Sequence, residues 1–200
     1  MSAQPARQPR GEARRRALLE ATLRLVGKEG AGAVTHRAVA AEAGLPLAAT
    51  TYYFSSREEL LAEALEHTAG EDLAQLARDA PLLAAPPLTV ETLSERLADL
   101  VVAWLRGDRP TLLAQYEISL EAARRPELAA TSRAWSDAYV EAIAVPLAAL
   151  GSDDPRADGR LVFAALCGVV LDELSAPHDD FEGSVLRPSV TRLLRGLVGR

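Results

Sequence analysis

The sequence predicts an all-α protein, and three observations carry this prediction. Alanine, leucine and arginine are the most frequent residue types, and all three favour helices. Aromatic residues make up only 4% of the 200 residues, and runs in which Val, Ile or Thr alternate with polar residues are missing. Glycines and prolines instead divide the chain into segments with apolar residues at helical spacing.

The N-terminal part is expected to begin with an arm and a helix. Residues 1–10 contain two prolines and no apolar pattern, so we assign residues 1–11 to a flexible basic arm. A helix over about residues 12–29 follows, because Leu18 and Leu25 lie on one apolar stripe. The glycine-rich sequence after it ends this helix.

Two short helices are predicted next, within residues 35–54. Thr35 is a good cap for the first of them. Gly44 can take the left-handed conformation that ends a helix. Pro46 suits the first turn of the second helix, where its missing N–H would lack a partner anyway.

The rest of the chain predicts longer helices. Ser56, with Glu59 three residues on, forms a capping box and starts a helix that Pro81 should stop. Residues 81–89 form a proline-punctuated linker, and residues 177–183 form a loop. Further helices are predicted over about residues 90–106, 108–125, 127–150, 155–174 and 189–198.

A helix, a tight glycine-containing turn and a second helix make the helix-turn-helix arrangement, whose second helix can lie in the DNA major groove. An ordinary helical hairpin has the same spacing. The residues that decide between the two are Thr35, Ala43-Gly44-Leu45, Tyr52-Tyr53-Phe54 and Ser56-x-x-Glu59-Leu60. They resemble the DNA-binding domain of TetR-type transcriptional regulators, with a likeness that extends without a gap upstream to Arg16.

This resemblance implies two domains. The first is an N-terminal three-helix helix-turn-helix DNA-binding domain over residues 12–56, and the second is a C-terminal helical ligand-binding and dimerisation domain over residues 57–200. The family's members form homodimers through their last two long helices, to which Leu193, Leu194 and Leu197 are expected to contribute here. A repressor is implied more strongly than an activator.

The resemblance also implies the DNA contacts. The hydroxyl of Thr35 can hold a phosphate as well as cap its helix, and Arg37 can bond guanine O6 and N7, although a solvated surface arginine is the alternative. Tyr53, Tyr52 and Arg57 occupy positions for phosphate contacts, but one tyrosine can instead pack against the first helix. The full set of expected DNA-binding residues is Thr35, His36, Arg37, Pro46, Leu47, Ala48, Ala49, Thr51, Tyr52, Tyr53 and Arg57.

The recognition helix departs from the family's pattern. Many relatives have a polar or basic residue at Leu47, and glycine and a hydroxyl residue at Ala48 and Ala49; Thr50 stands where a buried leucine is frequent. Few side chains that can bond base edges remain, and Leu47 and Ala49 could contact thymine methyl groups instead. The double-stranded operator, expected to be pseudo-palindromic, therefore has no predicted base sequence.

A patch in the second half resembles one branch of the same family. It runs from Gln115-Tyr116-Glu117 through Glu121 to Leu128. Family members bind small ligands in this part of the chain, so we expect a small apolar effector of unknown identity. Its expected contacts, for which plain core packing is the alternative, are Trp104, Tyr116, Trp135 and Tyr139.

Net charge is −6, which at first opposes a nucleic-acid partner. Residues 1–37 nevertheless hold eight Lys or Arg against three acids, and residues 38–200 hold fourteen against twenty-five. A local basic surface can therefore meet phosphates while the rest of the protein stays acidic.

Other classes of protein fit less well. The three histidines are scattered, and neither a catalytic Ser-His-Asp frame, a metal-binding set nor a glycine-rich phosphate loop is present, so we expect neither an enzyme nor a cofactor. A helical scaffold that binds only protein remains the third class, against which the basic N-terminal part and the tyrosine pair count. Without a secretion signal or a membrane-spanning apolar run, the expected location is cytoplasmic, with no membrane partner.

Overall fold

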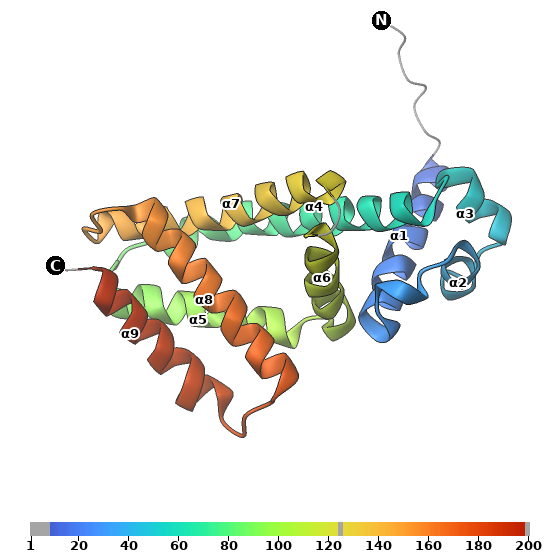
Figure 1. The fold of residues 1–200 in the computed structure, drawn as a ribbon. Coiled ribbons are helices and arrows are strands. Elements are labelled where there is room, and N and C mark those ends of the chain that lie inside the picture. Colours follow the sequence, from blue (N-terminus) through green and yellow to red (C-terminus); the bar gives the residue numbers. More distant parts are fainter. Residues whose placement is uncertain (1–8, 124–125, 199–200) are drawn as a thin grey trace, which may run out of the picture. The chain divides into compact units, whose positions relative to one another are not determined.

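The computed structural model describes residues 9–123 and 126–198, and within this part the regular elements are all helical (Figure 1). In chain order they are α1 (Pro9–Glu29), the 3-10 turn η1 (Ala31–Ala33), α2 (His36–Glu42), α3 (Leu47–Tyr53), α4 (Arg57–Leu83), α5 (Val90–Arg106), α6 (Arg109–Ala122), α7 (Pro126–Ala149), α8 (Pro155–Ser175), the π-helix η2 (Phe181–Leu186) and α9 (Arg187–Leu197). In this part of the chain, no helix is long and apolar enough to cross a membrane.

The chain forms two compact units. The first unit comprises the chain up to Ala69 together with residues 108–131, and the second comprises residues 70–107 and 132–200. Helix α4 therefore begins in the first unit and continues into the second. The predicted division into domains at residue 56 stays a prediction, but the compact units divide elsewhere because the start of α4 and the whole of α6 pack with α1.

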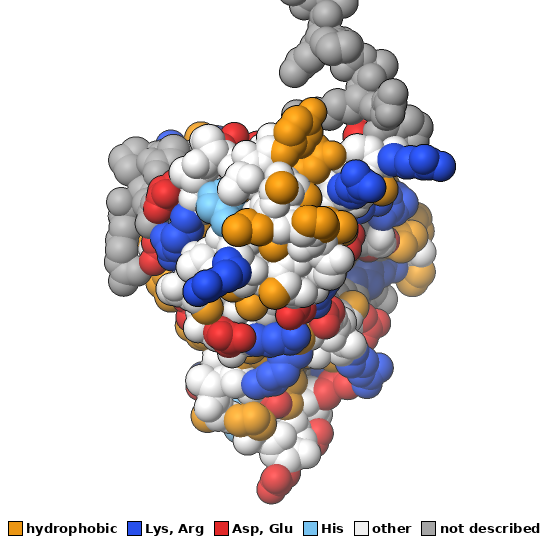
Figure 2. All heavy atoms as spheres, turned by 90° about the vertical axis from the view of Figure 1, so that its right-hand side faces the viewer, with side chains coloured by type: hydrophobic (Ala, Val, Ile, Leu, Met, Phe, Trp, Pro, Cys, Tyr) orange, Lys and Arg blue, Asp and Glu red, His pale blue; other side chains and the backbone are white. Residues whose placement is uncertain are grey.

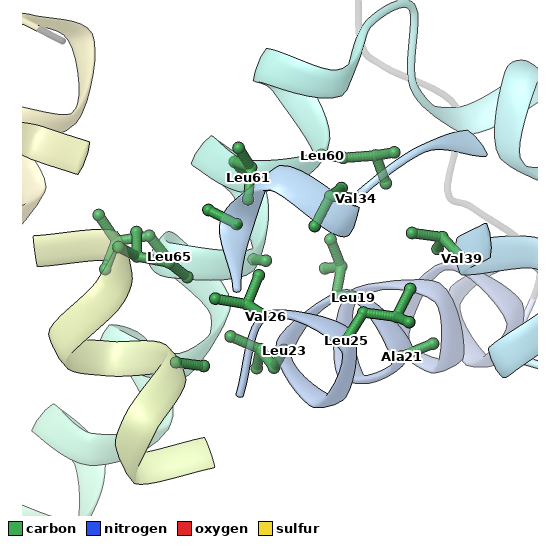
Figure 3. Packing of buried hydrophobic residues seen from close by; sticks show 14 of the residues in the cluster. Leu19, Ala21, Leu23, Leu25, Val26, Val34, Val39, Leu60, Leu61 and Leu65 are labelled. Atoms are coloured by element: carbon green, nitrogen blue, oxygen red, sulfur yellow. The ribbon is translucent and has the colours of Figure 1, made fainter. Parts of the chain in front are cut away.

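An apolar core holds the first unit together (Figure 3). Leu19 and Val26 of α1 meet Val39 of α2 and Leu61 of α4 there, and Ile118 of α6 completes the cluster. All five side chains are almost fully removed from water, so their burial supplies the main driving force for assembling this unit.

Helix α6 approaches α1 with the backbones almost in contact. A Cβ atom built on Gly27 of α1 would lie 1.9 Å from the carbonyl oxygen of Pro110, the second residue of α6. Only glycine leaves room for such an approach. The sequence analysis had not foreseen this contact, because it joins segments that are remote in the chain.

The turn between α2 and α3 has the expected geometry. Thr35 caps α2, with its hydroxyl accepting from the backbone N–H of Ala38 at 3.1 Å. Gly44 has φ of 64°, the left-handed conformation that glycine adopts without strain. Pro46 lies at the N-cap of α3, one residue before the helix, rather than inside its first turn.

The start of α4 differs in detail from the expected capping box. The hydroxyl of Ser56 accepts from the backbone N–H of Glu59 as expected. The carboxylate of Glu59 reaches back past Ser56 to the N–H and hydroxyl of Ser55. These bonds lower the pKa of Glu59, because they favour its ionised form.

Helices α5, α8 and α9 pack together with η2 in the second unit. Leu97 of α5, Leu166 of α8 and Leu194 of α9 are buried. Arg187, the first residue of α9, ties this helix to α5 through ion pairs with Glu95 and, at 2.9 Å, with Asp99. Leu194 was expected at a dimer interface, but it belongs to this core.

Several predicted boundaries were wrong. Helix α1 begins at Pro9, so residues 9–11 are helical rather than part of a flexible arm; residues 1–8 of that arm lie outside the described part. Helix α4 continues through Pro81 to Leu83. The predicted loop over 177–183 passes into η2 at Phe181, where Asp180 caps the first turn through the N–H of Gly183.

Candidate DNA-binding and effector sites

The outer face of α3 is open to solvent. Tyr52 is 81% exposed and Leu47 is 49% exposed, and Ala48 and Thr51 are exposed beside them. Thr50 lies on the opposite, fully buried face, where its hydroxyl donates to the carbonyl of Leu47 at 2.8 Å. The threonine that replaces the family's frequent leucine is thus accommodated by a bond within its own helix.

The two neighbouring tyrosines have different environments. Their rings meet edge to face with centroids 4.9 Å apart. Tyr53 is half-buried, and its hydroxyl lies 3.4 Å from the position that a Cβ on Gly11 of α1 would take. Tyr53 is therefore the tyrosine that lies against the first helix, and Tyr52 is the one that faces solvent. Phe54 is 1% exposed, as its predicted core position requires.

Helix α2 presents three of the predicted contact residues at its start. Thr35 and Arg37 are exposed, whereas His36 is half-buried. Its Nδ1 atom is buried and has no hydrogen-bond partner among the described residues. The exposed pair can reach a ligand outside the protein, but the buried side of the His36 ring cannot.

Arg57 already has a partner inside the protein. Its Nη2 donates to the carbonyl of Ala31 at 2.6 Å, and its Nη1 lies 3.5 Å from the carboxylate of Glu58. The side chain therefore fastens η1 to the start of α4. Its predicted phosphate contact stays a prediction and would use the remaining N–H groups of the guanidinium.

The basic residues of α1 divide into two groups. Arg24 and Lys28 both bind Glu42 of α2, at 2.9 and 3.2 Å, and the bond from Arg24 contributes most to lowering the pKa of Glu42. Arg15 pairs with Glu63 and lies over the Phe54 ring. These three cations are engaged within the unit.

Other basic side chains of α1 are exposed at its N-terminal end, among them Arg14 and Arg16. Figure 2 looks onto the side of the molecule that carries α3. Apolar and uncharged atoms occupy the middle of this face, and basic side chains lie to either side of it. Such a distribution suits an anionic partner whose charges flank a less polar centre.

Three of the four predicted effector contacts form an aromatic cluster in the second unit. The Tyr139 ring meets the rings of Trp104 and Trp135, with centroids 5.5 and 5.1 Å away. Phe163 of α8 joins them, stacked on Tyr139 at 5.2 Å and edge to face with Trp135. Tyr116 lies on α6 in the first unit and is not one of these rings.

A carboxylate on α4 completes this cluster. Asp72 accepts from Trp135 Nε1 at 2.9 Å and from the Tyr139 hydroxyl at 3.4 Å. Burial raises the pKa of Asp72, against the smaller opposing effect of these two bonds. Burial and the neighbouring Asp72 together raise the pKa of Tyr139 above its ordinary range, so the phenol stays protonated and donates.

Sequence reasoning missed Asp72 and Phe163. Asp72 lies on a helix that alternates acidic and apolar residues, where one buried carboxylate has no distinguishing local pattern. Phe163 belongs to the most apolar stretch of the chain, where an aromatic side chain is expected to pack in the core without any other role. The described residues contain no group of His, Cys, Asp and Glu side chains arranged to hold a metal ion.

Two known domain families match the chain. Residues 18–64 match the family described as bacterial regulatory proteins, tetR family, and residues 88–200 match the tetracyclin repressor-like C-terminal domain. The first match contains α2 and α3, and the second contains the helices of the aromatic cluster apart from α4.

Individual relatives agree with these matches. The HTH-type nicotine-responsive transcriptional repressor HdnoR of Paenarthrobacter nicotinovorans is 32% identical over 166 residues, which cover 82% of this chain and 83% of HdnoR. The multidrug binding protein EbrR, solved with ethidium, is 32% identical with a TM-score of 0.71, over 94% of this chain and 99% of EbrR. EbrR has also been solved with proflavin and with malachite green.

A solved TetR-family member from Streptomyces coelicolor A3 is similar to the same extent. It is 33% identical with a TM-score of 0.71, over 94% of this chain and 99% of the relative. These proteins are regulators and ligand binders rather than enzymes, as the sequence analysis expected. Through its two matched domains and its helix-turn-helix, the chain belongs to the TetR family of transcriptional regulators.

Proposed function

We propose that this regulator is a homodimeric repressor that binds a pseudo-palindromic operator and is released by a small effector with a large apolar part. The exposed outer face of α3 is the observation that carries the proposal. An exposed, largely uncharged helix face with basic groups beside it has the chemistry to enter a major groove while its flanks meet phosphates.

The composition of that face supports a particular kind of base recognition. Leu47 and Ala48 offer methyl groups, and Thr51 and Tyr52 offer hydroxyls. Methyl groups match the thymine C5-methyl in the major groove, whereas Arg37 is the exposed side chain here that can bond guanine at two points. We therefore propose an operator half-site that combines thymine-rich positions with a guanine facing Arg37.

Arg37→Ala tests the DNA site. Operator fragments selected from the source genome should bind this variant about 10- to 100-fold more weakly, and discrimination at one base should relax, since a bidentate contact is worth about 1–3 kcal/mol. Arg133→Ala is the matched control, because Arg133 is also exposed but lies on α7 in the second unit. Unchanged affinity and specificity in a folded Arg37→Ala protein would remove Arg37 from the site.

A second copy of the chain is the proposed partner of α8. This helix exposes an apolar stripe made of Leu161, Ala164, Gly168 and Leu171, and each of the two leucines is 50% exposed. Their spacing places them on one face, and the small residues between them allow another helix to approach closely. A two-fold dimer through this stripe would present two α3 helices to two half-sites.

Leu171→Glu tests the dimer without disturbing the core. Sedimentation should show a monomer that keeps its helix content and loses tight operator binding, because a charge cannot be buried without a partner. Leu120→Glu is the control, since Leu120 is 63% exposed but lies on α6. A variant at Leu171 that remains a dimer contradicts the proposed interface.

The proposed release of the operator relies on α4. One end of this helix contributes Leu60 and Leu61 to the core of the first unit, and its continuation carries Asp72 into the aromatic cluster. An effector that binds the cluster can therefore bias a helix that starts next to the helix-turn-helix. Effector and operator should weaken each other's binding by the same factor, about 5- to 150-fold.

A further inference from the structure

The carboxylate of Asp72 has only neutral hydrogen-bond partners in the described part of the chain. Its hydrogen-bond donors are the indole N–H of Trp135 and the hydroxyl of Tyr139, which are both neutral. Among the residues that the structure describes, no Lys, Arg or His forms an ion pair with it. Glu63, another half-buried carboxylate of α4, differs in this respect because it forms an ion pair with Arg15.

Such a carboxylate is costly unless something compensates it. Removing a carboxylate from water weakens its hydration, and two neutral donors replace only part of that stabilisation. The raised pKa of Asp72 reflects the same imbalance. A site that carries an uncompensated negative charge next to aromatic rings is complementary to a positive charge on an apolar body.

The rings around Asp72 fit this complementarity. Trp104 and Trp135 are half-buried, so part of each indole remains accessible; the Trp135 N–H bonds the half-buried Asp72, and the Trp104 ring meets Tyr139. Tyr139 and Phe163 are buried, and their rings pack against the indoles. Indole faces attract cations more strongly than other aromatic side chains do, and the attraction grows when water is excluded.

We infer that the cluster of Asp72, Trp104, Trp135, Tyr139 and Phe163 binds a lipophilic organic cation, with Asp72 as its counter-ion. The inference rests on the proposed effector site and narrows its ligand from apolar compounds in general to positively charged ones. A bare metal ion is a poor alternative, because a single carboxylate supplies too few oxygen ligands for Ca²⁺ or Mg²⁺.

A purely architectural role for Asp72 makes a different prediction. If the carboxylate only orients Trp135 and Tyr139, an amide oxygen at the same place does so equally well. Asp72→Asn keeps the acceptor and removes the charge. Asp79→Asn is the matched control, because Asp79 lies on the same helix and bonds only Gln75 there.

The experiment compares two three-ring probes in mildly alkaline buffer and without DNA. N-methylacridinium carries a permanent positive charge, and acridine is uncharged under these conditions. Quenching of Trp104 and Trp135, the only two tryptophans of the chain, reports binding at the cluster. The wild-type protein and Asp79→Asn should bind the cation at least about tenfold more tightly than acridine, as expected for a charge pair combined with a cation–π contact.

Asp72→Asn should lose most of that preference while its affinity for acridine changes little. A variant that keeps the preference overturns the inference, and so does a wild-type protein that binds acridine as tightly as N-methylacridinium or binds neither probe. Operator binding is then measured with and without the cation. If the cation binds through Asp72 but leaves operator affinity unchanged, the role of Asp72 as counter-ion stands and the proposed release of the operator fails. If the cation weakens operator binding but Asp72→Asn keeps the preference for the cation, the proposed release stands and the role of Asp72 as counter-ion fails.

Discussion

The outer face of α3 and the aromatic cluster around Asp72 are built in opposite ways. The α3 face consists of consecutive turns of one short helix, and its side chains point away from the protein. The cluster collects one or two residues from each of α4, α5, α7 and α8, and its side chains are bonded to one another. The proposed DNA contact can therefore be carried by a single element, whereas the proposed effector site needs several elements to surround a ligand.

The difference also affects what holds each region in place. The α3 face depends on the apolar core beneath it, against which Ala49 and Tyr53 of α3 pack, and on the buried Phe54 that follows the helix. The cluster is part of the core of the second unit, so the residues that we propose to contact the effector also stabilise the fold. Substitutions on α3 should therefore change function with little effect on stability, and substitutions in the cluster should change both.

The largest expected effect comes from a pair of buried phenylalanines, one in each unit. Phe54→Ala should destabilise the first unit, and Phe163→Ala the second, by about 3–5 kcal/mol each. Both tryptophans lie in the second unit, so their fluorescence follows that unit while circular dichroism follows all helices. When Phe54→Ala is heated, the loss of helix should begin at a lower temperature than the change in fluorescence. In Phe163→Ala, the loss of helix should not begin before the change in fluorescence. Coincident transitions in both variants would show that the two units unfold as one.

The next largest expected change in stability concerns two glycines. Replacing one of them by alanine should destabilise the protein, and replacing the other should stabilise it. Gly27→Ala places a methyl group against the backbone of Pro110 and should cost about 1–3 kcal/mol through overpacking between α1 and α6. Gly70→Ala lies in the middle of α4 with open space around it and should stabilise by about 0.5–1 kcal/mol. Urea denaturation measures both. If Gly27→Ala leaves the stability unchanged, α6 can move away from α1 at little cost in free energy.

The titration of Asp72 links the stability of the cluster to its ligand. Because folding raises this pKa above its ordinary value of 3.8, the native protein binds the proton more tightly than the unfolded chain does. Relative to Asp72→Asn, the wild-type protein should lose stability as the pH rises from 3.8 through the raised pKa, whereas binding of N-methylacridinium should weaken as the pH falls through it. The neighbouring Cys167, whose pKa burial raises to about 11, and the Tyr139 phenol titrate at higher pH.

These two opposite trends are measured by denaturation and by fluorescence titration across the same buffers. Asp72→Asn should show neither trend. If the affinity for N-methylacridinium proves independent of pH in the wild-type protein, another group supplies the negative charge.

The smallest expected effect compares two helix caps. Thr35 caps α2 and Thr89 caps α5, each through its hydroxyl. Replacing either by Ala should cost about 1 kcal/mol of stability. Only Thr35→Ala should also weaken operator binding, because its hydroxyl is expected to hold a phosphate. Equal operator affinity in both variants would restrict Thr35 to its structural role.

Much of the first unit could be predicted because its signals are local. The cap at Thr35, the left-handed Gly44 and the buried Phe54 lie within a short stretch, and each acts through neighbours a few residues away. The predicted span of α5 was also confirmed, because Thr89 and Gly107 bound it by similar local means. The continuation of α4 through Pro81 was missed, since a proline inside a helix is tolerated or not according to the contacts around it.

Local chemistry in the sequence by itself thus determined most of this protein's helices and its helix-turn-helix, and the residues of that motif indicated the family by their resemblance to it. Tertiary structure alone decided which distant residues meet: Asp72 with Trp135, Gly27 with Pro110, and Arg187 with Asp99. The physical reason is that caps and turns depend on hydrogen bonds between near neighbours, whereas the cluster and the α1–α6 approach depend on how whole helices pack. One acidic residue among many on α4 acquires its chemistry only when that packing removes it from water and surrounds it with aromatic rings.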